Sequence, residues 1–447
     1  MLRGESIEEL RVVDISKDGW GIAYLDNKVV KVKYGVPGDV VKAKVWAVRK
    51  GRRRVEYWAD ILEVLSKGDD RIEAKCPYFG RCGGCRFQNM RYDAQLRFKK
   101  RLIENAFKEY DIDVSIDDVI PSPKIYYYRN RMDYPVGVDD EGNVVAGLKM
   151  IGRWDVIIDL NECHLMSIES IEILKRVKEF ISKHNIQAYN VKTHEGFLRY
   201  VVVREGKYTG DRLVIFITKK GAFVDIEELA KEISDLVTGV VWGINDRLAD
   251  LSVAEEVMPI YGRDYINEVV NGFKYHIHPN AFFQTNSYQT GNLVNLVYGF
   301  ASGGKLLLDV YSGVGLFSIA LHDKYESIIG IEIDPYAVYS ARINVNRLGS
   351  SSIAFLESSA EDALSRFHEK PDTVILDPPR PGISKIVRRN ILRLEPSEII
   401  YVSCNPESMA RDIKLLLNKY IIEDVIKPID MFPHTPHIEA VARLVKK

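Results

Sequence analysis

Four near-continuous apolar segments occur at similar intervals in the last part of the chain, and stretches of helical spacing separate them. The segments cover residues 305–310, 328–333, 373–377 and 398–403. Strands that are apolar throughout are typical of parallel sheets with helices on both faces, because such strands have no solvent-facing side. We therefore predict a Rossmann-like, doubly wound α/β domain over residues 271–447.

The beginning of the chain has a different pattern. Short segments between residues 11 and 45 alternate apolar with polar side chains, and turn sequences such as Asp18-Gly19 separate them. Alternation of this kind with close turns predicts β-strands. Four or five strands in so short a span favour a small closed β-barrel of the OB kind over residues 1–64.

A basic cluster lies near the end of this predicted barrel. Residues 42–54 hold seven lysines and arginines and no acidic residue, and Trp46, Tyr57 and Trp58 lie within or just beyond them. Basic side chains follow a phosphate backbone while aromatic rings stack on bases, so the cluster suits RNA. The alternative is a solvated edge strand whose charges prevent pairing with other strands.

Two further parts fill the middle of the chain. Residues 65–110 contain three of the five cysteines and then a stretch of helical spacing from Tyr92 to Tyr110. Residues 111–270 mix strand and helix patterns and predict a central α+β domain. Its clearest segments are 199–204 and 213–217 as strands, and 168–183 and 226–236 as helices. The whole chain is therefore expected to be a multidomain α/β protein.

The cellular compartment follows from the apolar runs and from the cysteines. No apolar run approaches the roughly 20 residues that a membrane helix requires. We expect a cytoplasmic protein, a monomer with no membrane partner. Thiols stay reduced in the cytoplasm, so clustered cysteines there bind metal or catalyse more often than they form disulfides.

Four of the five cysteines form one pattern. Five residues separate Cys76 from Cys82, two separate Cys82 from Cys85, and Cys163 follows far downstream. Close cysteines with a distant fourth ligand are the outline of a 4Fe–4S ligand set. A zinc site is the weaker alternative, because structural zinc usually draws on two close-spaced ligand pairs. We call Cys76, Cys82, Cys85 and Cys163 the four-cysteine set.

A glycine-bearing turn closes the first strand of the predicted parallel sheet. Residues 309–315 read Asp-Val-Tyr-Ser-Gly-Val-Gly, and Glu332 ends the next strand 21 residues after Tyr311. Glycines allow a backbone to approach a ligand, and an acidic strand end accepts hydrogen bonds from ribose hydroxyls. Ser318 replaces the third glycine of dinucleotide folds. This pattern favours S-adenosylmethionine over NAD.

Asp377-Pro378-Pro379-Arg380 follows the third apolar segment. Enzymes that methylate exocyclic amines have a similar motif, but they usually place an aromatic residue after the two prolines. Arg380 stands there in this chain, which makes amine methylation a weaker alternative. The motif has a second possible meaning, since the prolines also serve simply to end a strand.

The fifth cysteine, Cys404, directly follows an apolar strand and precedes Asn405-Pro406. Ligands bind outside the carboxyl ends of strands in such sheets, so we interpret Cys404 as a nucleophile there. A lone cysteine is more often a small buried hydrophobic residue, and its position favours the catalytic interpretation. Glu439 is the candidate base, with His434 and His437 as alternatives.

Together these residues resemble the RNA uracil-C5 methyltransferase family, which includes enzymes for T-loop uridines of tRNA and for uridines of 23S rRNA. The likeness covers essentially the whole chain. Residues 1–64 look like the TRAM domain, an RNA-binding barrel, and the four-cysteine set matches the iron–sulfur ligands of the family. The sequence Phe-Phe-Gln-Thr-Asn around Gln284 matches its cofactor-side motif, residues 403–406 its nucleophile motif and residues 437–439 its base motif.

The resemblance implies a reaction and its cofactors. It implies S-adenosylmethionine and a 4Fe–4S cluster, and an RNA substrate, either tRNA or 23S rRNA. Cys404 would add to carbon 6 of uracil, which makes carbon 5 nucleophilic enough to accept a methyl group, and Glu439 would then remove the proton at carbon 5. The residues that the resemblance places at the cofactor or substrate are Gln284, Tyr311, Glu332 and Asp377. Leu316 stands where some relatives carry asparagine.

Three alternatives stay open at this point. A T-loop uridine of tRNA is favoured over a 23S rRNA uridine, although the motifs do not decide between them. A non-catalytic iron–sulfur RNA-binding protein is a second possibility, which intact Cys404 and Glu439 disfavour. Cytosine methylation is the third, and enzymes of that kind place proline before the nucleophilic cysteine, where this chain has Ser403. The tyrosine-rich segment 126–131 is expected either to contact RNA or to lie in the core.

Overall fold

The computed structural model describes residues 6–50 and 54–447, and the chain forms two compact units. The first unit comprises residues up to Leu102 together with Phe432–His437, and the second comprises Ile103–Met431 and Ile438–Lys447. Arg52 and Arg53 of the basic cluster lie outside the described residues. Among the described residues, no helix is long and apolar enough to span a membrane.

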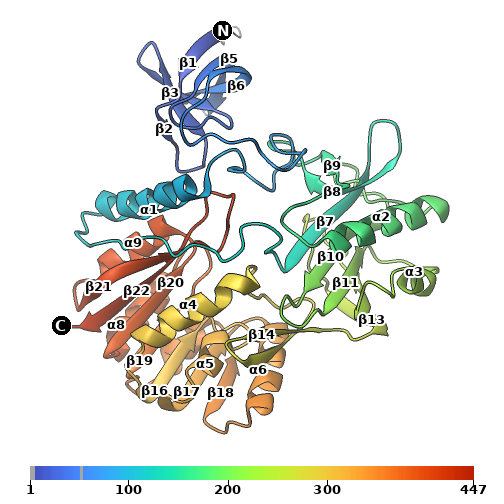
Figure 1. Cartoon of the computed structure of the whole chain (residues 1–447). Helices are drawn as coiled ribbons and strands as arrows, with labels where there is room; N and C mark the ends of the chain where they lie inside the picture. Colours follow the sequence, from blue (N-terminus) through green and yellow to red (C-terminus); the bar gives the residue numbers. More distant parts are fainter. Residues whose placement is uncertain (1–5, 51–53) are drawn as a thin grey trace. The chain divides into compact units, whose positions relative to one another are not determined.

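A six-stranded sheet with the strand order β1-β5-β6-β4-β3-β2 forms the first part of the first unit (Figure 1). Its core is a cluster of small and branched residues that includes Val30, Val41 and Ala59, all fully buried. In the described part of the unit, no ladder joins β1 to β2, so closure of the barrel stays a prediction. The strands are β1 (Ser6–Arg11), β2 (Asp14–Ile15), β3 (Gly21–Leu25), β4 (Lys28–Val32), β5 (Val40–Lys50) and β6 (Arg54–Ser66).

A segment from near the C-terminus completes the first unit. Helix α1 (Tyr92–Glu109) begins in this unit, as its helical spacing predicts. The buried Lys99 donates from Nζ to the carbonyl of Phe432 at 2.9 Å, and Gln95 Oε1 accepts the backbone N–H of His434 at 2.9 Å. Both partners belong to residues 432–437, so side chains of α1 hold this late segment in the first unit.

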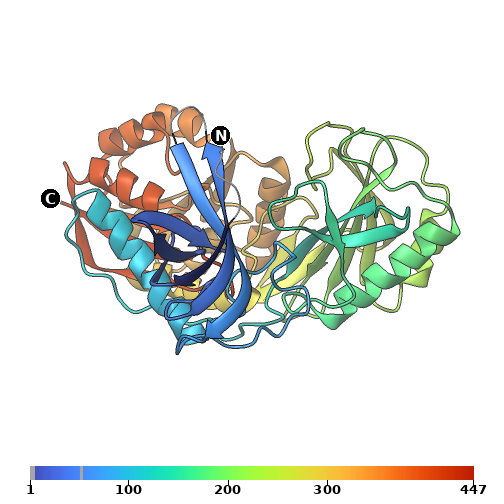
Figure 2. The same cartoon turned by 90° about the horizontal axis from the view of Figure 1, so that it is seen from above.

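A seven-stranded sheet begins the second unit, and helix α2 packs against it (Figure 2). The predicted helix 168–183 is confirmed as α2 (Ile168–Lys183), and α3 (Ile226–Glu232) is shorter than predicted. The strand order is β13-β12-β11-β10-β7-β8-β9. The strands are β7 (Arg131–Val138), β8 (Val144–Lys149), β9 (Ile157–Asp159), β10 (Leu198–Glu205), β11 (Arg212–Thr218), β12 (Gly239–Ile244) and β13 (Glu256–Gly262).

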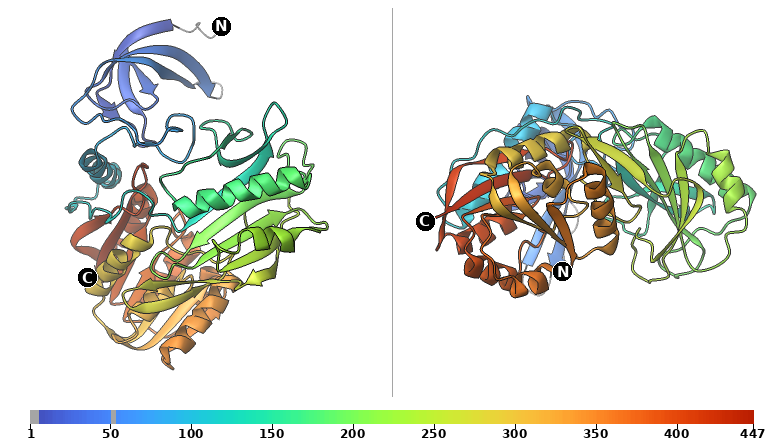
Figure 3. Two further views of the ribbon diagram at one scale, coloured as in Figure 1. Left: turned by 45° about the vertical axis from the view of Figure 1, so that its right-hand side comes forward. Right: turned by 90° about the horizontal axis from the view of Figure 1, so that it is seen from below.

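The second sheet of this unit is the predicted doubly wound one, with helices on both faces (Figure 3). Its order is β18-β17-β16-β19-β20-β22-β21, and all pairs are parallel except those of β22. The strands are β16 (Gly304–Val310), β17 (Tyr325–Glu332), β18 (Ile353–Glu357), β19 (Thr373–Leu376), β20 (Glu398–Ser403), β21 (Tyr420–Ile429) and β22 (Glu439–Lys446). Multidomain α/β architecture is therefore confirmed.

A short hairpin, β14 (Ile266–Val270) and β15 (Phe273–Ile277), precedes this sheet, and the predicted domain boundary at 270/271 falls within its turn. Helix α6 packs against β15, so the hairpin is part of the C-terminal layer. The helices of this part are α4 (Ser287–Phe300), α5 (Leu316–Ala320), α6 (Pro335–Leu348), α7 (Ala360–Arg366), α8 (Lys385–Leu394) and α9 (Pro406–Leu416).

Candidate active site

The nucleophile and base candidates meet at the carboxyl edge of the parallel sheet. Cys404 directly follows β20, which ends at Ser403, and Glu439 is the first residue of β22. Strand β22 runs antiparallel to β20, with Ser403 opposite Ala440. Because the strands run in opposite directions, the beginning of β22 lies at the end of β20. The ladder therefore sets Glu439 next to Cys404.

The glycine turn after β16 has three residues with left-handed backbone. Tyr311 has φ 68°, Gly313 has φ 54° and Gly315 has φ 84°. A Cβ on Gly315 would lie 2.7 Å from the ring of Phe355, so the position excludes any side chain. The amides of Tyr311 and Ser312 both donate to the carbonyl of Ile331, which ties the turn to the end of β17.

Glu332 holds this turn from the neighbouring strand. Its Oε2 accepts the backbone N–H of Gly313 at 2.9 Å, and its Oε1 accepts those of Ile333 at 2.8 Å and Asp334 at 2.9 Å. Oε1 accepts two N–H groups and Oε2 accepts one, so Oε2 can also accept a hydroxyl donor. The role of Glu332 as a ribose partner stays a prediction.

Two carboxylates lie close to the turn, of which Asp309 is buried and Asp377 is half-buried. Ser318 donates to Asp309 Oδ2 from its backbone N–H at 3.0 Å and from its hydroxyl at 2.6 Å. Burial raises the pKa of Asp309 to about 6. Burial and the charge of Asp309 also raise the pKa of Asp377, which follows β19. Asp309 was not singled out from the sequence, since nothing in its segment distinguishes it from an ordinary strand residue.

Gln284 joins this group from the segment before α4. Its Nε2 donates to Asp377 Oδ2 at 3.3 Å. Asn130 fixes the segment, because its Nδ2 donates to the carbonyl of Gln284 at 2.8 Å and its backbone N–H donates to the carbonyl of Thr285 at 3.0 Å. Within the same tyrosine-rich stretch, Tyr128 is fully buried and belongs to the core. Asn130 and Tyr128 therefore stabilise the segment that carries Gln284 and the core next to it.

Burial has the largest effect on the pKa of Cys404, and its charged neighbours act beside it. Burial, Glu439 and Asp377 raise the pKa of the thiol, while the charge of Arg380 and a hydrogen bond from its side chain lower it, and the net value is about 11. Burial and Asp377 likewise raise the pKa of Glu439 well above its usual range, and Arg380 lowers it. Burial thus favours the protonated forms of both groups, and Arg380 opposes this effect.

The remaining predicted residues have other environments. Leu316 is buried at the start of α5, where its carbonyl accepts from the hydroxyl of Tyr275 at 3.2 Å. Its side chain therefore packs in the core. The alternative bases His434 and His437 belong to the first unit, and His434 is buried against Gln95 there. Glu439 thus stays the candidate that the sheet itself places beside Cys404.

The four-cysteine set divides between the units, with three members in the first and Cys163 in the second. Hydrogen-bond donors point at several of the sulfurs. Gln88 Nε2 lies 3.2 Å from the Sγ of Cys85, and the N–H of Gly84 lies 3.4 Å from the Sγ of Cys82. Backbone N–H groups of Leu165 and Met166 bond to the sulfur of Cys163. Such donors suit thiolate ligands, because they stabilise negative sulfur.

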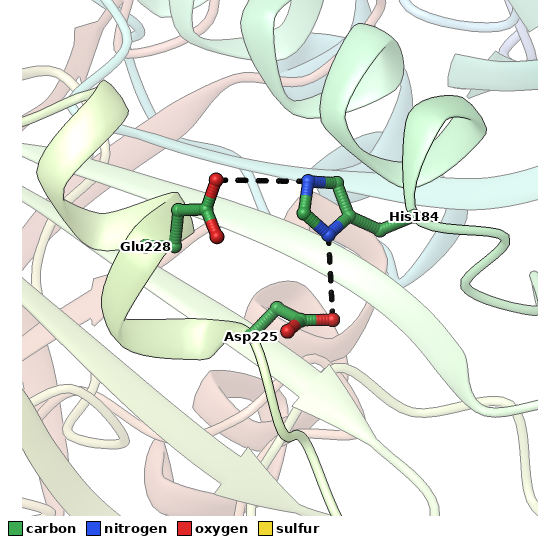
Figure 4. A group of neighbouring side chains, drawn as sticks. All are labelled: His184, Asp225 and Glu228. Carbon is green, nitrogen blue, oxygen red and sulfur yellow. Dashed lines mark ion pairs between the residues drawn. The ribbon is translucent and has the colours of Figure 1, made fainter.

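A second group of potential ligands lies between α2 and α3, and it was not predicted from the sequence. His184 Nδ1 lies 3.4 Å from Asp225 Oδ2, and His184 Nε2 lies 3.8 Å from Glu228 Oε1 (Figure 4). The ring also stacks on Phe180 with centroids 3.9 Å apart. The two nitrogens face different carboxylates on opposite sides of the ring. This arrangement suits a histidine that bridges two helices better than it suits a metal ion, which would need all three groups on one side.

Comparison with known proteins agrees with this geometry. The tRNA (Uracil-5-)-methyltransferase family matches residues 244–447, which include the whole parallel sheet. An uncharacterized RNA methyltransferase of Nanoarchaeum equitans is 41% identical over 98% of this chain and 93% of its own length. The chain belongs to the RNA uracil-C5 methyltransferase family. Members of this family are S-adenosylmethionine-dependent enzymes, so the predicted family and enzyme class are confirmed.

Two relatives within this RNA uracil-C5 methyltransferase family have a stated target. The tRNA (uracil(54)-C(5))-methyltransferase of Pyrococcus horikoshii is 38% identical over 97% of this chain and 99% of its own length. The crystal structure of the Pyrococcus abyssi tRNA (uracil-54, C5)-methyltransferase, in complex with S-adenosyl-L-homocysteine, superposes with a TM-score of 0.78. It is 34% identical in sequence, and the match covers 98% of this chain and all of that one.

Proposed function

We propose that this protein transfers a methyl group from S-adenosylmethionine to carbon 5 of uridine 54 in tRNA. The observation that carries the proposal is the ladder that sets Glu439 beside Cys404, next to the glycine turn of a methyltransferase sheet. Two relatives that match over nearly the whole chain are named as tRNA (uracil-54) enzymes, which favours tRNA over 23S rRNA.

In the proposed reaction, Cys404 is the nucleophile. Its thiolate adds to carbon 6 of the uracil ring, and the electron pair of the 5,6 double bond moves toward carbon 5 and the carbonyl oxygen at carbon 4. S-adenosylmethionine supplies the methyl group as an electrophilic sulfonium. Gln284, Tyr311, Glu332 and Asp377 are proposed to bind the cofactor or the base.

Glu439 completes the proposed reaction. After carbon 5 has gained the methyl group, its proton must leave before the ring can become aromatic again. The Glu439 carboxylate takes this proton, the 5,6 double bond re-forms, and the bond from carbon 6 to Cys404 breaks with its electron pair returning to sulfur. Glu439 must be ionised for this step, and the charge of Arg380 favours the ionised form.

We also propose that the four-cysteine set binds a 4Fe–4S cluster. The N–H groups directed at Cys82, Cys85 and Cys163 support this assignment, because thiolate ligands accept such bonds. The cluster would stabilise the fold of its segment by cross-linking residues that are distant in sequence. Iron and sulfide analysis of anaerobically purified protein tests the assignment, and zinc in their place would contradict it.

The N-terminal sheet is proposed to bind RNA in the manner of a TRAM domain. Lysines of β4 and the turn after it lie over aromatic rings of β5 and β6. The pairs are Lys28 over Tyr57 at 5.3 Å, Lys31 over Trp58 at 5.1 Å and Lys33 over Trp46 at 4.7 Å. Such pairs place cations and stacking surfaces together, which single-stranded or splayed RNA requires.

Labelled S-adenosylmethionine and unmodified transcripts test the main proposal directly. Wild-type protein should label a tRNA transcript, and a transcript with cytidine at position 54 should stay unlabelled. If a 23S rRNA fragment is labelled and tRNA is not, the substrate is 23S rRNA and the proposed tRNA substrate is wrong. No labelling of any RNA, with RNA still bound, would favour the non-catalytic binding protein.

A further inference from the structure

The loop after β19 is fixed to the middle of helix α9. Asp412 of α9 accepts the N–H of Ile383 at 2.8 Å, and Arg411 donates to the carbonyl of Pro381 at 2.6 Å. The loop turns at Gly382, whose N–H donates to the carbonyl of Pro379 at 2.8 Å. Its φ of 82° and the closeness of Asp412 leave no room for a side chain there. This part of the loop therefore has a defined conformation.

Asn405 connects this loop to the nucleophile. It is the N-cap of α9, and its Oδ1 accepts the N–H of Glu407 at 3.2 Å. Its Nδ2 donates to the carbonyl of Arg380 at 2.9 Å. One side chain thus caps the helix that follows Cys404 and holds the backbone of Arg380. Cys404 itself directly precedes the cap, at the positive end of the helix dipole.

Charges reach Cys404 from several elements. Glu439 at the start of β22 and Asp377 after β19 act as anions, and Arg380 acts as a cation that also hydrogen-bonds the sulfur. The same guanidinium acts on Glu439. The two neighbouring carboxylates disfavour the thiolate form of Cys404. A cation at the position of Arg380 favours that form and so counteracts them.

We propose that Arg380 is the cation that stabilises the anionic sulfur of Cys404, and that Asn405 is the positioning residue that holds Arg380 there. This inference rests on the proposed role of Cys404 as nucleophile. Arg380 is then a catalytic residue in the strict sense, because it contacts the reacting sulfur. Its side chain is exposed on one side, and the rival role for an exposed arginine is a contact with an RNA phosphate.

Alkylation of Cys404 without RNA separates these roles. At one fixed pH below the thiol pKa, the rate of reaction with iodoacetamide is proportional to the thiolate fraction. The modified Cys404 peptide is quantified by mass spectrometry, which distinguishes it from the other cysteines. Loss of a nearby opposite charge shifts a pKa by about 1 to 3 units. The thiol pKa of Cys404 should therefore rise in Arg380→Gln, and alkylation should slow about tenfold or more.

Matched variants complete the test. Arg380→Lys keeps the charge and should restore part of the rate. Asn405→Ser keeps a good helix cap but removes the donor to Arg380, so it should slow alkylation several-fold. Arg389→Gln removes a charge from the exposed face of α8 and should leave the rate unchanged. Circular dichroism checks that each variant is folded, and Asn405→Ser serves if Arg380→Gln is not.

The outcomes distinguish this inference from the proposed function. An unchanged alkylation rate in Arg380→Gln, with weaker tRNA binding, would overturn the role of Arg380 and assign it to RNA. Normal methyl transfer by Cys404→Ala would instead overturn the nucleophile itself. If Cys404→Ala is inactive and Arg380→Gln is alkylated slowly, the results support both the nucleophile role of Cys404 and the role of Arg380.

Discussion

Cys404 and Glu439 are neighbours because Ser403 lies opposite Ala440 in the antiparallel ladder of β20 and β22. Two segments that are distant in sequence are thereby fixed by backbone hydrogen bonds, which resist small displacements of the side chains. The proposed covalent catalysis would benefit from this arrangement, since its nucleophile and its base would act in turn on adjacent carbons of one ring.

Cys404→Ala should bind tRNA and S-adenosylhomocysteine normally and transfer no methyl group. The substitution removes the sulfur that activates carbon 5, while the half-buried site keeps its neighbours. Transfer of labelled methyl and binding by filter assay measure the two properties separately. Methyl transfer at more than a small fraction of the wild-type rate would exclude a covalent role for Cys404.

Glu439→Gln should transfer the methyl group and then fail to release the RNA. The amide has nearly the same shape but cannot accept the proton at carbon 5, so the Cys404 adduct accumulates. A denaturing gel should show labelled RNA that migrates with the protein. The double variant with Cys404→Ala is the control and should show no such band, whereas normal turnover by Glu439→Gln would transfer the base role to another residue.

Asp309→Asn should flatten the pH dependence of stability. The pKa of Asp309 is raised by burial from 3.8 to about 6, so its contribution to stability is present below the lower value and is lost as the pH rises through the higher one. A shift of this size corresponds to about 3 kcal/mol. Between these two pH values, the melting temperature should change more steeply with pH in the wild type than in Asp309→Asn. Glu369→Gln, at an exposed position, is the control and should match the wild type.

Gly315→Ala should lower both stability and cofactor affinity. The position has φ 84°, and the added Cβ would meet the Phe355 ring at 2.7 Å. Strain of this kind costs about 1 to 3 kcal/mol. Gly349→Ala is the matched control, since Gly349 has φ 71° but nothing within 4 Å of the added atom. Calorimetric titration with S-adenosylhomocysteine should show a large loss for the first variant and none for the second.

Cys163→Ala should lose the iron and sulfide of the cluster while the methyltransferase sheet stays folded. The fourth ligand is required for a complete 4Fe–4S site. Metal analysis and visible absorbance of anaerobically purified protein measure the loss, and Cys404→Ala is the control that keeps the cluster. Full iron and sulfide content in Cys163→Ala would remove Cys163 from the ligand set.

Much of the fold was predictable because it depends on local patterns. The apolar segments became β16, β17, β19 and β20, and the helical spacing of residues 168–183 gave α2 with the predicted bounds. Strand β21 was missed, because Glu423 and Asp424 interrupt its apolar run. Helix α3 ends four residues earlier than its pattern, since Ile233 already has the role of C-cap.

Only those residues of the candidate site that belong to sequence motifs could be predicted. Sequence patterns identified Cys404, Glu332 and Asp377, because each follows or ends a strand of the parallel sheet. The roles of Asn405 and Asn130 depend on single hydrogen bonds between distant segments, at 2.9 Å and 2.8 Å, and no pattern encodes such pairs. Register explains the pairing of Cys404 with Glu439, and register follows from tertiary contacts.

Residues 432–437 belong to the first unit although they lie just before the final strand of the chain. The N-terminal part of the protein leaves the ribosome first, yet Lys99 and Gln95 receive their partners from this segment only when translation is almost finished. A truncated chain that stops before residue 432 would therefore lack partners for two buried side chains of α1, so the first unit is completed only at the end of translation.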